Sequence, residues 1–485
     1  MQYKWTVLTV TTVGQLMASL DFSLIIVALP TIIEALNISL FAGIWVITGY
    51  RLMLTILMIT IGRFADIMGR VRLYNTGFTI FTVGSALCAL STSGELLVAS
   101  RLIQGLGAAL LFVNSMALVA DAFPASELGT AIGINQVAIN TGQIMGYTLS
   151  GVMIALCGWR SIFWINVPVG VFGTIWTHRR LRDLYRAVEK QRFDYPGAIL
   201  FSTGLTLVLL SLTLGGLRSV TAQLILAAGI VLLAVFLFHE ARVDEPVLDM
   251  SLFKIRPFTA GNLSNLVNGM AYAGLTFELT LYLQLVKGLS PLQTGIAIIP
   301  MQVTFIFVGP ISGRLSDKYG VRGLSTVGLA LTSVALLMLS TFSIDTSAVT
   351  ISAALALVGL GIGMFRSPNA SSVMGSVPPE RRGMGSGVRS TVMNISQSVS
   401  IPLTLTLMTA VMPYDKLAVV VSATTLSNSL EVLDLLGAIR YGFFAFAVIN
   451  GLGVIPSILR GPRTNSPNGK SLGQAHAPHP HSGHE

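Results

Sequence analysis

The sequence predicts an all-helical polytopic membrane protein, and three observations support that fold class. Of 485 residues, 53% are hydrophobic and only 11% are Asp, Glu, Lys or Arg, whereas soluble proteins carry about 25% charged residues. Apolar stretches of roughly twenty residues recur along the chain, and each can cross a hydrocarbon core of about 30 Å as a helix. Sequence motifs of the first half also return in the second, which indicates an internal duplication.

We expect fourteen membrane-spanning helices, which places both termini on one side of the membrane. The apolar run after the first five residues continues to Pro30 without a small-residue cleavage pattern, so it is interpreted as the first helix and not as a signal peptide. The expected spans are 7–30, 42–62, 73–92, 96–120, 129–155, 161–178, 195–215, 221–240, 258–285, 293–312, 323–343, 348–372, 384–411 and 439–460.

Basic residues in the short loops set the orientation. Arginines gather in the loops 63–72 and 178–194, and Lys318, Arg322 and Arg381 fall on the same side. By the positive-inside tendency this side is cytoplasmic, so both termini are expected in the cytoplasm and the protein in the cell membrane. The net charge of +9 follows from this topology, and nucleic acid is not an expected partner.

The internal repeat divides the helices into six plus two plus six. Gly62-Arg-Phe-Ala-Asp-Ile-Met-Gly69 follows the second expected helix, and Gly313-Arg-Leu-Ser-Asp-Lys-Tyr-Gly320 follows the tenth. Gly105-Leu-Gly107 and Gly359-Leu-Gly361 form a second matching pair. The predicted domains are a six-helix bundle over 1–178, a cytoplasmic loop with two linker helices over 179–257, a six-helix bundle over 258–460 and a disordered His-rich cytoplasmic tail over 461–485.

The repeated loop has a physical rationale. Glycines permit a tight turn between antiparallel helices, cations anchor the loop in the cytoplasm, and the aspartate can pair with a cation or face a helix N-terminus. A hairpin stabiliser would explain one copy, but two copies at matching positions favour a role in conformational switching. The residues assigned to these loops are Gly62, Arg63, Asp66, Gly69, Arg70, Gly313, Arg314, Asp317 and Gly320.

These motifs together resemble those of the major facilitator superfamily. The loop from Gly62 to Arg72 is similar to the signature loop of that family, and Arg101-Leu-Ile-Gln-Gly105-Leu-Gly107 to its fourth-helix motif. The segments Leu20-Asp21 to Leu29-Pro30 and Trp159-Arg160 to Val167-Pro168 resemble signatures of the fourteen-helix drug:proton antiporter branch. The resemblance covers about residues 5–460 and implies two rocking six-helix bundles that export a hydrophobic or cationic compound in exchange for protons.

The fifth expected helix carries a glycine pattern similar to the antiporter-associated motif of that family. Gly133, Gly142, Gly146 and Gly151 match it, but Tyr147 stands in place of the proline. Closely spaced glycines serve either close helix packing or a pliable hinge, and we assign these four to the hinge. The missing proline weakens the prediction of export relative to that of the fold.

Ionisable residues inside the expected helices are costly in lipid and indicate functional positions. Asp21 and Arg51 both lie about 13 Å below the outer boundary at 1.5 Å per residue, so an ion pair between them is predicted. The pair either opens as Asp21 gains and loses a proton or is a static pair that offsets buried charge. Arg51 is unusual, because the family more often has an apolar residue there.

Two further residues are assigned to proton coupling together with Asp21 and Arg51. Arg101 corresponds to the fourth-helix arginine that the family links to proton transfer, although a long guanidinium also snorkels or pairs with a carboxylate. Glu278 in the ninth helix is either a second protonatable carboxylate, a contact for a cationic solute or a hydrogen-bonded structural acid.

A polar stripe on the ninth helix and an arginine on the twelfth are assigned to the substrate cavity. Asn262, Asn265 and Tyr272 are spaced by three and seven residues, which places them on one helix face. Arg366 stands where the family more often has an apolar residue, and it either disfavours cationic solutes or forms a local clamp. The predicted cavity residues are Gln15, Asn262, Asn265, Tyr272, Arg366 and Asn369.

The predicted function is proton-coupled export of small amphipathic or hydrophobic compounds by alternating access. The alternative is an uptake symporter or facilitator for an anionic or zwitterionic solute. No nucleotide-binding loop, His-Glu-x-x-His motif or nucleophile elbow occurs in the sequence, so neither an enzyme nor a cofactor is predicted. The partners expected are a small-molecule substrate, protons and the lipid bilayer, with a monomeric protein; the four histidines of the tail, which lack a scaffold, are not predicted to hold a metal.

Overall fold

The computed structural model describes residues 3–183, 194–214, 219–243, 248, 250–378, 382–422 and 429–460. This part of the chain is helical and contains no strand. The helices are α1 Tyr3–Leu36, α2 Leu40–Met68, α3 Arg70–Leu90, α4 Gly94–Ala122, α5 Ala125–Cys157, α6 Ser161–Trp164, α7 Asn166–Arg180, α8 Tyr195–Thr213, α9 Val220–Glu240, η1 Met250–Lys254, α10 Arg256–Leu281, η2 Tyr282–Val286, α11 Pro291–Tyr319, α12 Val321–Leu339, α13 Ala348–Gly375, α14 Arg382–Met408, α15 Tyr414–Ser422, α16 Ser429–Leu452 and α17 Val454–Leu459.

The predicted class, an all-helical polytopic membrane protein, is confirmed. Each of the fourteen expected spans overlaps a helix or a pair of consecutive helices. Ten helices in the described residues are long and apolar enough to cross a membrane, or eleven if α5 and the strongly bent α6–α7 segment form one broken span. The polar helices α10 and α14 are not among the ten, so the number fourteen stays a prediction.

Two helices extend well beyond the expected spans because polar residues do not stop them. The first helix continues through Pro30 to Leu36. The last expected span, 439–460, begins earlier, since α16 starts at Ser429 and carries Glu431 and Asp434 in its first turns. The predicted tail over 461–485 and most of the cytoplasmic loop, 184–193, lie outside the described residues.

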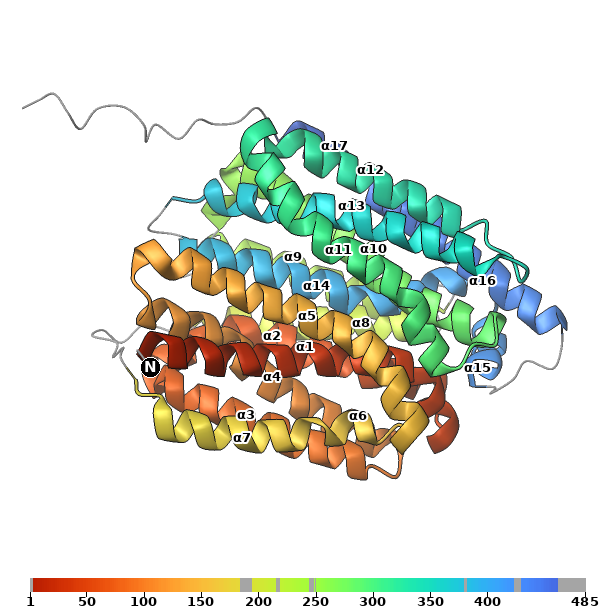
Figure 1. Cartoon of the computed structure of the whole chain (residues 1–485), viewed down its shortest axis with the longest axis horizontal. Coiled ribbons are helices and arrows are strands. Elements are labelled where there is room, and N and C mark those ends of the chain that lie inside the picture. The colour runs from red at the N-terminus through yellow and green to blue at the C-terminus, as the bar shows by residue number, and fades with distance from the viewer. Residues whose placement is uncertain are drawn as a thin grey trace, which may run out of the picture.

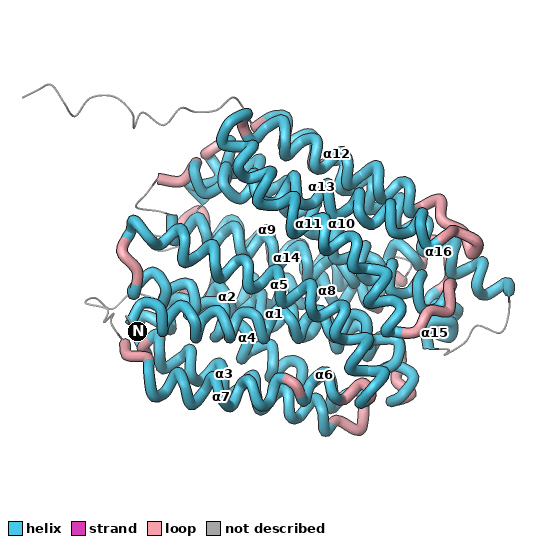
Figure 2. Tube along the Cα trace, viewed as in Figure 1, coloured by secondary structure: helices cyan, strands magenta, loops and turns pink. Residues whose placement is uncertain are grey.

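The helices form a bundle of roughly parallel rods in which early and late segments occupy different sides (Figures 1 and 2). Helix α1 packs on α5, and α4 packs on α2 and α3. In the later part, α13 packs on α11 and α12, and α10 on α14. The two groups meet where α5 contacts α11 and α2 contacts α14, while α8 packs on α9 and contacts α2 and α14.

The second repeated motif occupies equivalent packing positions in both groups. A Cβ placed on Gly105 would lie 2.7 Å from the carbonyl oxygen of Tyr50 on α2, and one on Gly359 would meet the carbonyl of Met301 on α11. Similarly, Gly107 lies against the backbone of α3 and Gly361 against that of α12. Glycine therefore permits the same two close helix crossings in each group, as an internal duplication predicts.

The prediction that the first repeated motif forms a loop is wrong for most of its residues, because 62–68 and 313–319 are the last turns of α2 and α11. Of the motif, only Gly69 and Gly320 lie between consecutive helices. Gly69 and Gly320 adopt φ values of 96° and 88°, which favour glycine. In the first copy, the Asp183 carboxylate accepts a hydrogen bond from the Val71 N–H at 2.7 Å, and Arg70 pairs with Asp121 at 2.5 Å. Gly313 and the exposed Arg314 lie on α11. The surroundings of Gly62, Arg63, Asp66 and Asp317 lie outside the described residues.

Candidate transport site

A buried ionic network surrounds Asp21 in the middle of α1. Its side chain is 1% exposed, and its Oδ2 lies 2.6 Å from Nη1 of Arg101 on α4. Its Oδ1 accepts hydrogen bonds from Gln104 at 2.9 Å and from Asn166 at 2.7 Å. The carboxylate therefore receives three hydrogen-bond donors from α4 and α7, which satisfy both of its buried oxygens.

Arg101 is the centre of this network and is fully buried. Its Nε donates to the carbonyl oxygen of Val46 at 2.9 Å, and its Nη1 also donates to Gln104 at 2.6 Å. The guanidinium carbon lies 4.3 Å from the centre of the Tyr50 ring on α2, a cation–π contact. Arg101 thus connects α1, α2 and α4, and its role as a partner of a carboxylate agrees with one of the two sequence interpretations.

The predicted ion pair between Asp21 and Arg51 is wrong. Asp21 pairs with Arg101, whereas Arg51 lies 3.4 Å from the centre of the Phe22 ring and donates to Asn394 on α14 across 3.4 Å. Asp21 and Phe22 are consecutive, so they point to different sides of α1. The predicted pair was based on equal depth in the membrane, but depth does not fix which side of a helix a residue faces.

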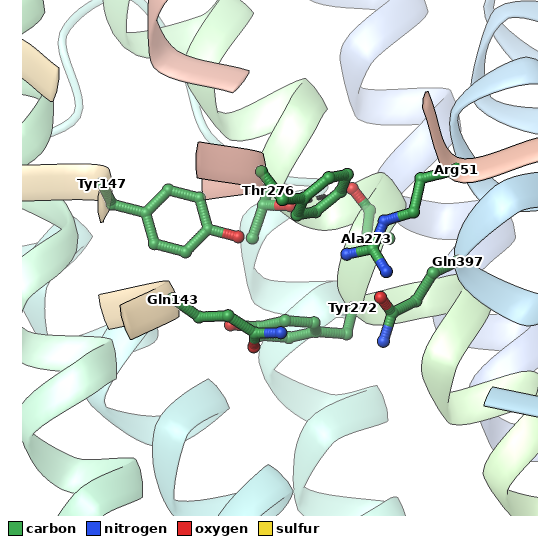
Figure 3. A pocket seen from close by; sticks show the side chains of 8 residues that line it. Arg51, Gln143, Tyr147, Tyr272, Ala273, Thr276 and Gln397 are labelled. Carbon is green, nitrogen blue, oxygen red and sulfur yellow. Dashed lines mark hydrogen bonds between the residues drawn. The ribbon is translucent and has the colours of Figure 1, made fainter. Parts of the chain in front are cut away.

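Arg51 lines a small cavity where the two groups of helices meet (Figure 3). Its volume is about 10 Å³, which is room for roughly one water molecule, so a solute enters only if the helices move apart. In Figure 3, Arg51 and Gln397 approach from one side, with Tyr147 and Gln143 on the other. The lining residues are Phe22, Arg51, Gln143, Tyr147, Tyr272, Ala273, Thr276 and Gln397.

Two pairs of consecutive residues connect the ionic network with the cavity. On α1, Asp21 binds Arg101 while Phe22 lines the cavity. On α2, Tyr50 stacks on Arg101 while Arg51 lines the cavity. A movement of either helix that disturbs the network therefore also moves a wall of the cavity.

Arg366 on α13 lies next to the cavity. Its guanidinium carbon is 4.4 Å from the centre of the Tyr272 ring, and Tyr272 lines the cavity. Arg389 on α14 lies close enough to Arg366 for the two charges to repel each other. Buried guanidinium nitrogens of Arg51, Arg366 and Arg389 lack a hydrogen-bond partner in the described residues.

Glu278 faces away from the cavity. Its carboxylate is fully buried against Gly442 on α16, and neither oxygen has a hydrogen-bond partner in the described residues. The structure therefore does not support the third interpretation of Glu278, a hydrogen-bonded structural acid, within the described residues. The assignment of Glu278 to proton coupling stays a prediction. Glu278 does not line the described cavity, so a contact with a solute there is not supported.

The predicted polar stripe on α10 contributes one residue to the cavity, Tyr272. Asn262 and Asn265 are buried but do not line it. Asn369 instead joins helices, because it donates to the Gly261 carbonyl oxygen at 3.1 Å and accepts from Arg460. Gln15 is buried on α1, outside the cavity lining, and its Oε1 has no partner in the described residues.

The fifth-helix glycines lie at two different interfaces of α5, which runs without a break from Ala125 to Cys157. Cβ atoms placed on Gly142 and Gly146 would lie 2.7 Å from the carbonyl oxygens of Leu16 and Leu20 on α1. Gly151 contacts the backbone of Pro291 and Leu292 on α11 in the other group. Gly142, Gly146 and Gly151 therefore serve close helix packing, the first of the two roles considered for this motif. The surroundings of Gly133 lie outside the described residues.

Sequence reasoning missed several residues of the site. Gln104 and Asn166 bind Asp21, and the only signal for this role was their position inside motifs that also contain a charged residue. Gln143, Tyr147 and Gln397 also line the cavity, and although Tyr147 stands at the proline position of the fifth-helix motif, no charge marked any of the three. In the described residues, no group of three or more His, Cys, Asp or Glu could hold a metal ion, and the histidine-rich tail lies outside them.

Comparison with known proteins places the chain in a family. The family model described as Major Facilitator Superfamily matches residues 11–401. A riboflavin transporter of Clostridioides difficile is 34% identical over 82% of this chain and 86% of its own. A tetracenomycin C resistance and export protein of Streptomyces glaucescens is 29% identical over 81% of this chain and 74% of its own.

The fold agrees with solved transporters of low sequence identity. A bacterial homologue of the human lysosomal transporter Spinster, solved inward-facing and occupied, superimposes with a TM-score of 0.69 at 16% identity, covering 95% of this chain and 97% of that chain. At this identity the likeness shows the fold. The chain therefore belongs to the major facilitator superfamily, whose members are multi-pass transporters of small molecules rather than enzymes.

Proposed function

We propose that this protein is a proton-coupled antiporter of the fourteen-helix drug:proton branch, which exports small amphipathic or hydrophobic compounds by alternating access. The observation that carries the proposal is the buried pair of Asp21 and Arg101, one residue away from the cavity wall on two helices. Export is consistent with the name of one relative, the tetracenomycin C resistance and export protein. A second relative is a riboflavin transporter, so the relatives do not share one substrate.

The coupling step is the protonation of Asp21. A proton on the carboxylate removes the negative charge that offsets Arg101, and a buried guanidinium without its counter-ion is strongly destabilised, by about 3–5 kcal/mol. Arg101 then has to find other partners, which changes its contact with Tyr50 on α2. Because Arg51 follows Tyr50, the solute cavity changes with the protonation state.

The alternation of access is assigned to the contacts between the two groups of helices. Thr55 on α2 and Ser398 on α14 share a hydrogen bond of 2.9 Å beside the cavity, and Gln284 donates to the Val27 carbonyl oxygen at 3.0 Å. Rocking of the groups at residues 1–178 and 258–460 would break such contacts on one side at a time. The repeated loops, the fifth-helix glycines and Glu278 are proposed to take part in this movement.

The proposed setting is the cell membrane, with both termini in the cytoplasm. The basic loops support this orientation. A single chain supplies both walls of the cavity, from α1, α2 and α5 on one side and α10 and α14 on the other. We therefore propose that the monomer is the transporting unit.

Proton movement in everted membrane vesicles tests the proposal. The vesicle lumen is acidified by respiration, fluorescein or rhodamine 6G is added outside, and the lumenal pH is followed with a quenched acridine dye. An exporter exchanges the added probe for lumenal protons, so at least one probe should raise the lumenal pH. A symporter that normally works in uptake would carry probe and protons inward together, so the opposite sign would contradict export and support the alternative.

The variant Asp21→Asn tests the assigned coupling residue. It keeps the shape of the side chain but cannot exchange a proton, so the pH response should fall to the level of vesicles without the protein. The exposed Asp415 on α15 offers a matched control, and Asp415→Asn should leave the response unchanged. Full proton-coupled transport by Asp21→Asn at normal membrane levels would refute the role of Asp21.

A further inference from the structure

We propose that the carried solute is an organic anion with a planar aromatic part, bound directly by Arg51 and attracted by Arg366 and Arg389. This substrate class rests on the proposed transport through the cavity of Figure 3. It differs from a cationic or neutral drug, which the family resemblance alone would imply. Three observations carry it: uncompensated positive charge, free hydrogen-bond donors and aromatic walls.

The first observation is that the three arginines have no acidic partner in the described residues. Four acids are buried in this part of the chain, and each lies elsewhere. Asp21 binds Arg101, Asp194 binds His239, Glu240 accepts from the Leu248 N–H, and Glu278 faces Gly442. Buried charges without partners are costly, so an anionic ligand at this place would be stabilised.

The second observation concerns the donors of Arg51. Its side chain is only 7% exposed, its Nε has no partner in the described residues, and its contact with Asn394 is long at 3.4 Å. The Phe22 ring lies 3.4 Å from the guanidinium carbon and covers one face of the group. The edge of the guanidinium remains for a ligand, and its geometry suits a carboxylate or a phosphate.

The other two arginines lie on helices of the second group close to the residues that line the cavity. Arg389 precedes Asn394, the partner of Arg51, by five residues on α14, which is about 8 Å along the helix axis. Arg366 lies between α14 and the Tyr272 ring, to which it is bound by a cation–π contact. Both helix groups thus contribute positive charge near the cavity, and such charge raises the local concentration of anions.

The third observation is the aromatic lining of the cavity. Phe22, Tyr147 and Tyr272 come from α1, α5 and α10, and rings on several sides favour a flat aromatic solute. Gln143 and Gln397 face the same space and offer amide groups to polar substituents of such a solute (Figure 3). An anion bound near these side chains would also reduce the repulsion between Arg366 and Arg389.

The experiment compares two probes that share a xanthene ring system but differ in charge. Fluorescein is an anion at neutral pH, whereas rhodamine 6G is a cation. Binding to purified protein in detergent is measured by fluorescence anisotropy without a proton gradient. We expect fluorescein to bind at least about tenfold more tightly, as the loss or gain of one charged hydrogen bond implies.

Substitutions then assign the preference to the arginines. Arg51→Gln and Arg366→Gln should each weaken fluorescein binding about tenfold or more and leave rhodamine binding unchanged or stronger. Arg366→Lys should retain most of the effect, since it keeps the charge. The exposed Arg440 on α16 bonds to the Ser340 carbonyl oxygen far along the sequence from these sites, and Arg440→Gln should change neither probe.

The outcomes separate this inference from the proposed antiport. If the wild-type protein binds rhodamine 6G as tightly as fluorescein, the anion preference is refuted, and this measurement does not depend on the folding of any variant. Equal fluorescein binding by Arg51→Gln, Arg366→Gln and the wild type would refute the assignment to these arginines. Arginine-dependent fluorescein binding without any proton movement in vesicles would support the inference and contradict the antiport mechanism.

Discussion

At the scale of single residues, the site shows what sequence position can and cannot determine. The depth of Asp21 and Arg51 follows from counting along helices, and both are buried as expected. Their partners depend on rotation about each helix axis and on where α4 and α7 lie, which no local pattern contains. Asn166 is 145 positions away from Asp21 in the sequence, yet it donates to it at 2.7 Å.

The contact between Glu278 and Gly442 gives a stability prediction at this scale. A Cβ on Gly442 would overlap the Glu278 carboxylate, so Gly442→Ala should destabilise the protein by about 1–3 kcal/mol through overpacking. Thermal unfolding of the purified protein, followed by intrinsic fluorescence, measures the change. The double variant Glu278→Ala/Gly442→Ala should recover most of the loss, because the shortened side chain makes room.

Gly387 on α14 provides the control for this pair. A Cβ placed on Gly387 meets nothing within 4 Å, and alanine favours a helix by up to about 1 kcal/mol over glycine. Gly387→Ala should therefore leave the unfolding temperature unchanged or raise it. An equal loss of stability in Gly442→Ala and Gly387→Ala would show that the Glu278 contact is not its cause.

At the scale of helices, the length of the apolar segments predicted where most helices lie. The spacing of polar residues predicted less well which residues of a helix line the cavity. The fourteen expected spans overlap the helices because a helix is the structure in which a single segment satisfies all its own backbone hydrogen bonds in lipid. The spacing of Asn262, Asn265 and Tyr272 does place them on one helix face, but α10 has neighbours along its whole length. Only Tyr272 lies at the level where the two groups leave a cavity.

The close crossing of α5 and α11 gives a prediction about conformation. A Cβ on Gly151 would overlap the backbone of Pro291 and Leu292, and one on Gly295 would lie 2.9 Å from the Tyr147 carbonyl oxygen. Alanine at Gly151 or Gly295 should push α5 and α11 apart. It should therefore favour the conformation in which the two helix groups are separated at this crossing. In a cysteine-free background, Gln284→Cys should then react several-fold faster with a membrane-impermeant maleimide.

The control for this prediction is also on α11. Gly309→Ala adds a Cβ that meets nothing within 4 Å, so it should leave the labelling rate of Gln284→Cys unchanged. Unchanged labelling in both Gly151→Ala and Gly295→Ala would mean that the crossing adapts to the added methyl groups, and that it does not control the opening.

At the scale of the whole molecule, the two helix groups share an architecture but differ in chemistry. The paired Gly105–Gly107 and Gly359–Gly361 motifs make equivalent crossings, and the sequence repeat predicted this correspondence. The carboxylate-bound arginine network lies in the first group, while Arg366 and Arg389 lie in the second without acidic partners in the described residues. Duplication preserves the crossings because they depend on small residues, whereas the charged positions are free to diverge.

Cross-linking of α2 to α14 tests the movement of the groups. The Thr55 and Ser398 hydroxyls lie 2.9 Å apart, so cysteines there are close enough for a disulfide, whose Cβ atoms are about 3.8 Å apart. With Cys88 and Cys157 replaced by serine, oxidation of Thr55→Cys/Ser398→Cys should stop probe transport in vesicles, and a reducing agent should restore it. Single variants should transport under both conditions, and full transport by the cross-linked protein would exclude rocking at this interface.

The alternation of Asp21 with Phe22 and of Tyr50 with Arg51 also bears on energy efficiency. In an uninterrupted helix, neighbouring side chains are rotated by a fixed angle of about 100°, so neither member of a pair can reorient its backbone alone. In the proposed antiport, a proton that reaches Asp21 without a solute must still displace a cavity wall. We therefore expect few protons to leak through the protein in the absence of solute. The proton gradient would then be dissipated by this protein only during solute transport.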